Sequence, residues 1–332
     1  MSMEAPKPEW TGQPIRLGVI GGSGLYKLEG IEIIDVVNPK TPWGYPSSPI
    51  SIAKTEAGTL VAFLARHGLH HAISPSNVPS TANIAALKHL GVRAILAFSA
   101  VGSLREEIRP KDFVVPSQII DRTKGVRRTS YFGEGEEKNV VAHASFGDPY
   151  DNHLRPIVED MYVGSLLTMP TLAEHSPTVR VHGHKTVVCM EGPAFSTRAE
   201  SLMYRQLGGD IINMSALPEA KIAREAELSY VLIATCTYVM RLTEATDYDA
   251  WRETSDTVSV AEVLESLKAN VEASQVVTKA LVDRVNELVG TDDSPIVKGL
   301  EGSMRFNVMT KPEHIPTEVK DRLRYLLPWF PQ

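Results

Sequence analysis

A series of predominantly apolar strand-like runs constrains the fold of this chain more than any other feature. The apolar residues in each run are consecutive instead of alternating with polar residues, which is typical of strands buried on both faces. The runs are Ile15–Ile20, Ile50–Ala53, Leu60–Ala65, Val92–Phe98, Phe113–Ile120, Lys185–Met190, Asp210–Ile212 and Tyr230–Thr235. Because helical segments alternate with them, we predict an α/β fold with one central twisted sheet, mostly parallel or mixed, flanked by helices.

The helical segments have recognisable ends. Ser80–Leu90 has Ser80 or Thr81 as its cap and ends at Gly91, and Thr197 and Glu200 form a capping box. Further helices are predicted from Pro218, within Val258–Val289 and over Glu318–Leu327. With no repeat or linker in view, we expect a flexible tail over residues 1–14, one domain over 15–310, and a C-terminal helix and tail over 311–332.

Charge and cysteine content exclude several classes of protein. A net charge of −6 over 332 residues argues against a surface built to hold a nucleic acid backbone. The only basic cluster, Arg122–Arg128, is interpreted as a solvated loop. Cys189 and Cys236 lie in apolar contexts, which suggests buried thiols in a reducing compartment. Since no signal peptide or membrane-spanning run is seen, we expect a cytoplasmic protein, with a nuclear fraction possible and no membrane partner.

Polar side chains follow several of the strand-like runs, and the ends of strands are where α/β proteins commonly bind ligands. They are Ser23, Arg66 with His67, Ser99 and Ser215. Each alone reads as a cap or turn, but together they offer a guanidinium, an imidazole and hydroxyl groups, which suit one inorganic phosphate. The helix expected from Pro218 adds an N-terminus that favours an anion.

Two other ligand classes fit the chain less well. Gly21–Leu25 lacks the spacing of a dinucleotide-binding fingerprint, so a nicotinamide-dependent oxidoreductase is disfavoured. His67, His70 and His71 invite a metal interpretation, but no acidic or cysteine partner stands at ligand spacing.

Many separate motifs carry a resemblance to a known family. They are Gly21–Leu25, Arg66–Gly68, Ser99–Leu104, Glu191–Pro193 with Phe195–Ser196 and Arg198–Glu200, Asn213–Ser215, Pro218–Glu219, and Thr246–Asp249 with Trp251. On them the chain resembles the trimeric purine nucleoside phosphorylases, most closely the branch that acts on S-methyl-5'-thioadenosine. The resemblance runs from about residue 15 to about residue 290, with residues 131–182 matching weakly.

The resemblance implies a fold, a reaction and a set of site residues. The fold would be nucleoside phosphorylase-like, and the reaction would be phosphorolysis of S-methyl-5'-thioadenosine to adenine and 5-methylthioribose 1-phosphate, in purine and methionine salvage. Phosphate would be bound by Ser23, Arg66, His67, Ser99, the Ala100 N–H and Ser215. Met214 would face the ribose, Phe195 and Ser196 would line the nucleoside pocket, and Val260 and Val263 would meet the 5' substituent. His143 would come from the neighbouring subunit of a homotrimer, and no metal or organic cofactor is implied.

Asp247 and Asp249 would face the purine in that comparison. An ionised carboxylate has only acceptors, so Asp247 suits the N6 amino group of adenine and a proton at N7. The 6-oxopurine enzymes have asparagine there, so Asp247 favours an aminopurine and a role as catalytic acid. Alternatives are a phosphorylase of inosine, guanosine or methylthioinosine, and a non-catalytic nucleoside-binding homologue.

Several residues within Cys236–Glu244 are extra relative to the family pattern. They precede Asp247 in the chain. Three readings stay open: a loop that leaves Asp247 in place, an artefact of gene prediction, or an insertion that displaces the base site.

Overall fold

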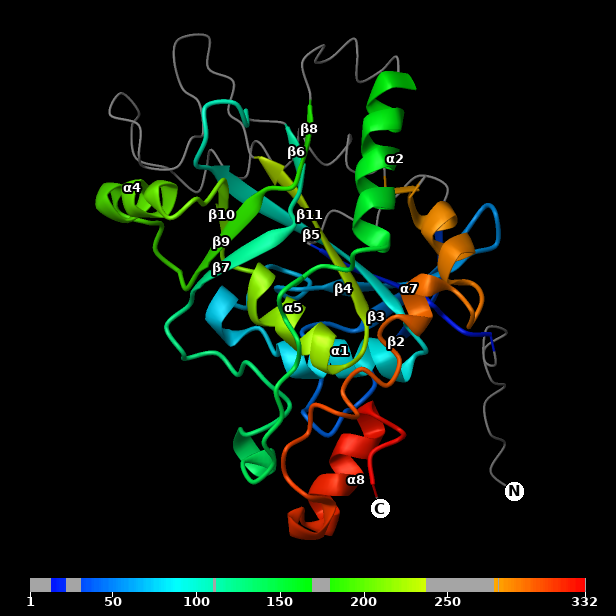
Figure 1. Cartoon of the computed structure of the whole chain (residues 1–332). Helices are drawn as coiled ribbons and strands as arrows, with labels where there is room; N and C mark the ends of the chain where they lie inside the picture. Colours follow the sequence, from blue (N-terminus) through cyan, green and yellow to red (C-terminus); the bar gives the residue numbers. More distant parts are fainter. Residues whose placement is uncertain are drawn as a thin grey trace.

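A mixed sheet with helices on both sides forms the molecule, as a computed structural model shows for residues 13–21, 31–109, 112–168, 180–236, 278–279 and 281–331 (Figure 1). Its strands are β1 (Leu17–Gly21), β2 (Ile31–Val37), β3 (Ile50–Thr55), β4 (Leu60–Ala65), β5 (Ala94–Ser103), β6 (Phe113–Val115), β7 (Gln118–Arg122), β8 (Val181–Gly183), β9 (Thr186–Met190), β10 (Ile211–Asn213) and β11 (Ser229–Cys236). The helices are α1 (Ser80–His89), α2 (Leu154–Thr168), α4 (Arg198–Gln206), α5 (Ala216–Glu225), α7 (Pro295–Lys298) and α8 (Thr317–Leu326), and residues 281–289 are also helical. The predicted α/β class and mixed sheet are confirmed.

Strand β5 joins the two parts of the sheet. It pairs in parallel with β1 over residues 94–97 and, on its other side, with β11 over residues 94–101. Its last residues, Gly102 and Ser103, pair antiparallel with β10, which continues to β9 and β7. The strand was expected to end at Phe98, but it runs on to Ser103. Ser99 therefore lies within a strand and not at its end.

Alternating side chains of the central strands supply two separate cores. In β5, Ile95 and Ala97 belong to the cluster on the side of α1, α5 and α8, whereas Leu96 and Phe98 belong to the cluster with α2 and α7 (Figure 1). Strand β11 alternates in the same way, with Leu232 on the first side. A strand with helices on both faces needs apolar residues at every position, which explains the unbroken apolar runs.

Two further local predictions were wrong. The run Phe113–Ile120 is two strands, β6 and β7, separated by Pro116 and Ser117 and paired with different partners. Proline lacks the N–H that a continuous ladder would use at that position. Pro79, rather than Ser80 or Thr81, caps α1, and it makes no side-chain hydrogen bond. The region 131–182, for which no helix was predicted, contains α2, whose Tyr162 is fully buried.

Other predictions were confirmed. Thr197 and Glu200 form the capping box of α4, and both cysteines are buried and free. Across the ranges described, no helix combines the length and apolar character required to cross a membrane.

Candidate active site

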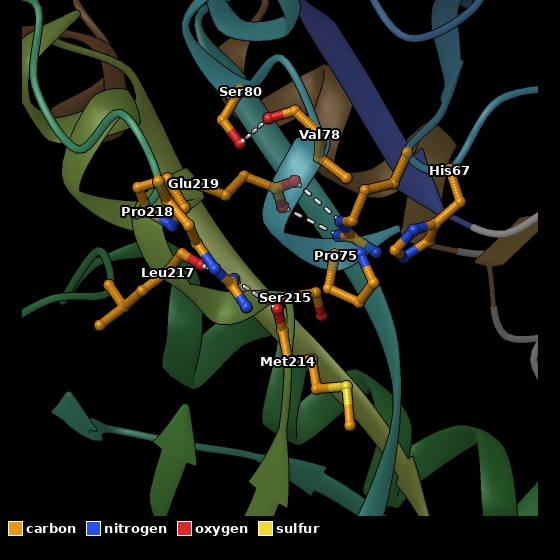
Figure 2. Close-up of a pocket in the computed structure, with 11 residues that line it drawn as sticks. His67, Pro75, Val78, Ser80, Met214, Ser215, Leu217, Pro218 and Glu219 are labelled. Carbon is orange, nitrogen blue, oxygen red and sulfur yellow. Dashed lines mark hydrogen bonds and ion pairs between the residues drawn. The ribbon is translucent and has the colours of Figure 1, made fainter. Parts of the chain in front are cut away.

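One pocket lies where the ends of β4 and β10 meet the start of α5 (Figure 2). Its lining residues are Arg66, His67, Pro75, Val78, Ser80, Arg127, Met214, Ser215, Leu217, Pro218 and Glu219. Arg66 follows β4 directly, and Met214 and Ser215 follow β10. The sheet thus brings together residues that stand far apart in the sequence, in a position typical of ligand sites in α/β proteins.

Arg66 is the buried cation of this pocket, with 3% of its surface exposed. Its Nε and Nη2 each donate to the Glu219 carboxylate at 2.8 Å, and its Nη1 donates to the Phe98 carbonyl at 2.7 Å. Although burial opposes its charge, the Glu219 carboxylate raises the pKa of Arg66 above its usual value. These contacts use three of the five guanidinium N–H groups, so two have no partner among the described residues.

Glu219 is itself held from a second direction. Its Oε1 also accepts a hydrogen bond from the Tyr230 hydroxyl at 2.8 Å. Glu219 is 1% exposed, so the Arg66–Glu219 pair is desolvated and bidentate, the geometry that fixes a guanidinium most firmly.

His67 lies beside Arg66 and is neutral at physiological pH. Burial and the neighbouring Arg66 charge lower its pKa from 6.5 to about 4. Its Nδ1 lies 2.8 Å from the Ile73 carbonyl. A carbonyl oxygen only accepts, so Nδ1 carries the proton and Nε2 has a free lone pair.

The hydroxyls of Ser99 and Ser215 and the amide of Asn213 form a polar cluster at the pocket. The Ser99 and Ser215 hydroxyls lie 2.9 Å apart, and Asn213 Nδ2 donates to Ser99 at 3.2 Å. Ser99 also donates to the Ala100 carbonyl at 3.0 Å. Leu217, with φ −118° and ψ 143°, interrupts the helical geometry of α5 after Ala216. Helix α5 thus begins at Ala216, two residues before the predicted start at Pro218, and only its uninterrupted part runs from Pro218.

Met214 packs closely against Gly192, which explains why glycine occupies that position. A Cβ on Gly192 would lie 2.4 Å from the Met214 sulfur, and Gly192 has φ +72°. Both facts favour glycine, because another residue would displace the Met214 side chain and adopt a strained backbone conformation.

Comparisons with known proteins identify the family of the chain. A family model described as the phosphorylase superfamily matches residues 16–283. The chain belongs to the phosphorylase superfamily.

Individual members of this superfamily are similar over nearly their whole length. The S-methyl-5'-thioadenosine phosphorylase of Mycosarcoma maydis is 64% identical over 321 residues, covering 97% of this chain and 96% of that protein. The crystal structure of a methylthioadenosine phosphorylase from an antarctic soil metagenomic library has a TM-score of 0.80 and 37% identity, covering 95% of this chain and 99% of the other. A methylthioadenosine phosphorylase from Schistosoma mansoni in complex with adenine has a TM-score of 0.76 and 31% identity, covering 89% and 99%.

The site residues named from the resemblance fall into three groups. Arg66, His67, Ser215 and Met214 line the pocket, and Ser99 with Ala100 adjoins it through the hydroxyl contact. Phe195, Ser196 and His143 lie outside the lining; Phe195 is 43% exposed, Ser196 is buried with its hydroxyl 3.2 Å from the Met190 sulfur, and His143 is exposed. Ser23, Asp247, Asp249, Val260, Val263 and the extra residues within Cys236–Glu244, except Cys236 itself, lie outside the described residues.

Two residues that line the pocket were not predicted from the sequence to be part of the site. Glu219 was noted only as part of a motif, although a glutamate that follows a helix-starting proline beside a buried arginine is a signal for an ion pair. Arg127 was assigned to a solvated loop, but it is 6% exposed and lines the pocket. A run of basic residues does not reveal which one points inward, so the sequence contains no signal that separates Arg127 from Arg128.

The histidines that follow β4 were considered as metal ligands. The rings of His67 and His71 lie 4.5 Å apart, centroid to centroid. Within the ranges that the structure describes, no three His, Cys, Asp or Glu side chains are arranged to hold a metal ion.

Proposed function

We propose that this chain is an S-methyl-5'-thioadenosine phosphorylase, which uses inorganic phosphate to release adenine and 5-methylthioribose 1-phosphate. The observation that carries the proposal is the 64% identity, over nearly the full length of both chains, to a protein of that name. The pocket supports it, because its groups suit phosphate.

Phosphate would bind between Arg66 and the hydroxyl pair Ser99 and Ser215. The two unpartnered N–H groups of Arg66 would donate to phosphate oxygens. Each hydroxyl has a single proton and would donate to phosphate by turning away from its present acceptor. Neutral His67 would accept a hydrogen bond through Nε2 from the proton that phosphate carries near neutral pH. Because Glu219 balances the charge of Arg66, dipoles and the start of α5 would supply part of the attraction. Ser23 and the Ala100 N–H would complete the phosphate site.

The nucleoside would extend from Met214 toward residues outside the described ranges. Met214 would lie against the ribose, with Phe195 and Ser196 lining the pocket. Asp247 and Asp249 would accept hydrogen bonds from the base, and Val260 would contact the methylthio group. An apolar contact leaves a buried 5'-hydroxyl without a partner, which disfavours ordinary nucleosides.

Cleavage would build positive charge on the ribose ring as the bond to N9 breaks. Phosphate, held on the opposite face, would stabilise that charge and bond to C1', while the electron pair of the broken bond passes to adenine. Asp247 would deliver or stabilise the proton at N7 as general acid. No metal or organic cofactor takes part in this scheme.

The active assembly would be a homotrimer in which His143 reaches a neighbouring site. An exposed apolar patch, formed by Val141, Phe306 and Met309 on the two segments that pair beside His143, supports an interface there. Phe306 is 93% exposed, which is costly for a phenylalanine that nothing covers. We place the enzyme in the cytoplasm, with a nuclear fraction.

The test is a phosphate-dependence assay with purified protein and S-methyl-5'-thioadenosine. Adenine should appear only when phosphate is present, and the sugar product should carry phosphate at C1. Adenine release at the same rate without phosphate would assign the chain to hydrolysis, and no release with phosphate would favour the non-catalytic homologue.

A further inference from the structure

A single arginine ties together the two chain segments that end at the pocket. Arg127 Nε donates to Glu191 Oε1 at 2.7 Å, and its Nη2 donates to the Met190 and Glu191 carbonyls at 3.2 and 2.6 Å. Its Nη1 donates to the Met214 and Leu217 carbonyls at 2.6 and 2.7 Å. All five N–H groups are therefore used within the protein, and none remains for a ligand.

The acceptors lie at the carboxyl ends of two neighbouring parallel strands. Met190 ends β9, and Met214 and Leu217 belong to the turn between β10 and the regular part of α5. That turn contains Ser215, so Arg127 holds it on both sides of the serine. Its carbonyls would otherwise be desolvated acceptors, and a buried unsatisfied acceptor costs about 1–3 kcal/mol.

Glu191 extends the same arrangement to a third segment. Its Oε1 accepts from Ser76 at 2.5 Å, and its Oε2 accepts from the Lys124 backbone N–H at 2.8 Å. Although burial opposes ionisation, the hydrogen bonds from Arg127, Lys124 and Ser76 keep the pKa of Glu191 below its usual value. The carboxylate is thus charged near neutral pH and anchors the short segment that begins at Pro75, another lining residue.

We propose that Arg127 is a positioning residue that sets the place of Met214 and Ser215 in the pocket. It acts through the backbone of that turn and not by touching substrate. Only a planar fork reaches these five acceptors, so lysine, with three donors around one atom, cannot replace it. Since misplacement by about 1 Å can cost about a hundredfold in rate, the loss should appear in catalysis. This inference rests on the proposed function.

The test compares R127K with R128K, a control at the adjacent arginine. Arg128 also pairs with a carboxylate, Glu137 at 2.7 Å, and donates to the Ser130 carbonyl, but it does not line the pocket. For R127K we expect kcat/KM for the nucleoside to fall by about tenfold or more, with kcat lowered and KM raised. The KM for phosphate should also rise. R128K should stay within about twofold of wild type. A merely structural role would lower the melting temperature and leave the constants of the folded enzyme unchanged.

A second readout does not depend on turnover. With 13C-methyl methionine, the Met214 signal, assigned through M214L, should shift in R127K and stay in place in R128K. An inactive wild type would refute the proposed function, while the methyl signal would still decide the positioning role. Unchanged kinetics in R127K, or an unshifted Met214 methyl, overturns the inference.

The experiment also tests the inference if R127K does not fold. Lysine keeps a positive charge beside Glu191, so R127K avoids an unpaired buried carboxylate. Should it fail to fold, the double variant R127M/E191M replaces the pair with apolar side chains, which is often tolerated. The double variant should fold and show the same loss of kcat/KM. If neither variant folds, Arg127 holds the fold as a whole and the positioning inference is wrong.

Discussion

At the residue scale, the buried pair Arg66–Glu219 decides how the phosphate-side cation is presented. In E219Q, Arg66 would face a neutral amide, and breaking a buried pair costs about 3–5 kcal/mol. We therefore expect a lower melting temperature and a higher phosphate KM, since the guanidinium is no longer held by two bonds. Calorimetry and phosphate titration check this, and E225Q on the same helix is the control for the phosphate titration. An unchanged phosphate KM in folded E219Q would contradict the role given to Glu219.

The raised pKa of Glu225 predicts a specific pH dependence of the stability of the folded protein. Burial raises its pKa from 4.5 to about 7, although Ser130 and the Tyr131 N–H donate to it. A carboxyl whose pKa is raised by folding stabilises the native state below pH 4.5, and this stabilisation is lost as the pH rises through about 7. The melting temperature of E225Q minus that of wild type should therefore grow from pH 4.5 to 7 and level off above. A difference independent of pH would contradict this.

At the scale of single elements, the capping box at the start of α4 follows the two residues assigned to the nucleoside pocket. The Thr197 hydroxyl accepts from the Glu200 N–H at 3.2 Å, and the Glu200 carboxylate accepts from the Thr197 N–H at 2.8 Å. T197A should destabilise the protein by about 1 kcal/mol in urea unfolding. Because the two side chains share one motif, T197A/E200A should cost less than the sum of the single changes. Strict additivity would show that the contacts act independently.

The elements also show why some features could be predicted and others could not. The central strands were predictable because burial on both faces leaves an unbroken apolar run, as in Tyr230–Thr235. The places of Arg66 and Ser215 at the ends of strands were predictable because each residue follows such a run. Strand β2, with exposed Ile33 and Val36, lies at the sheet edge and lacks that pattern. Arg127 was missed because its burial depends on four carbonyls and a carboxylate from distant segments, which no local pattern records.

At the scale of the whole molecule, the exposed apolar patch beside His143 bears on assembly. If the patch is the subunit interface, F306S/M309S should shift sedimentation from three copies toward one and reduce turnover, because His143 would no longer reach its neighbour. V36S is a matched control, since Val36 is 57% exposed on the edge strand β2. A double variant that remains trimeric would place the interface elsewhere, and a wild type that sediments as a single copy would contradict the proposed trimer.

Asp247 is the residue proposed to act on the base of the nucleoside. An aspartate that stabilises the N7 proton should make D247N lose about a hundredfold or more in adenine-nucleoside turnover. Single-turnover kinetics with S-methyl-5'-thioadenosine measure this directly, and D249N tests whether the neighbouring carboxylate acts differently. Unchanged kinetics in D247N would remove Asp247 from the catalytic role.

The nucleoside that the enzyme cleaves fastest depends on the groups that face the base and the 5' substituent. The most direct measurement is kcat/KM for S-methyl-5'-thioadenosine, adenosine and inosine, side by side at a fixed phosphate concentration with wild-type protein. We expect the methylthio nucleoside to be preferred, adenosine to be weaker because its 5'-hydroxyl lacks a partner, and inosine to be weakest because a carboxylate cannot donate to O6. A preference for inosine over both adenine nucleosides would contradict the account.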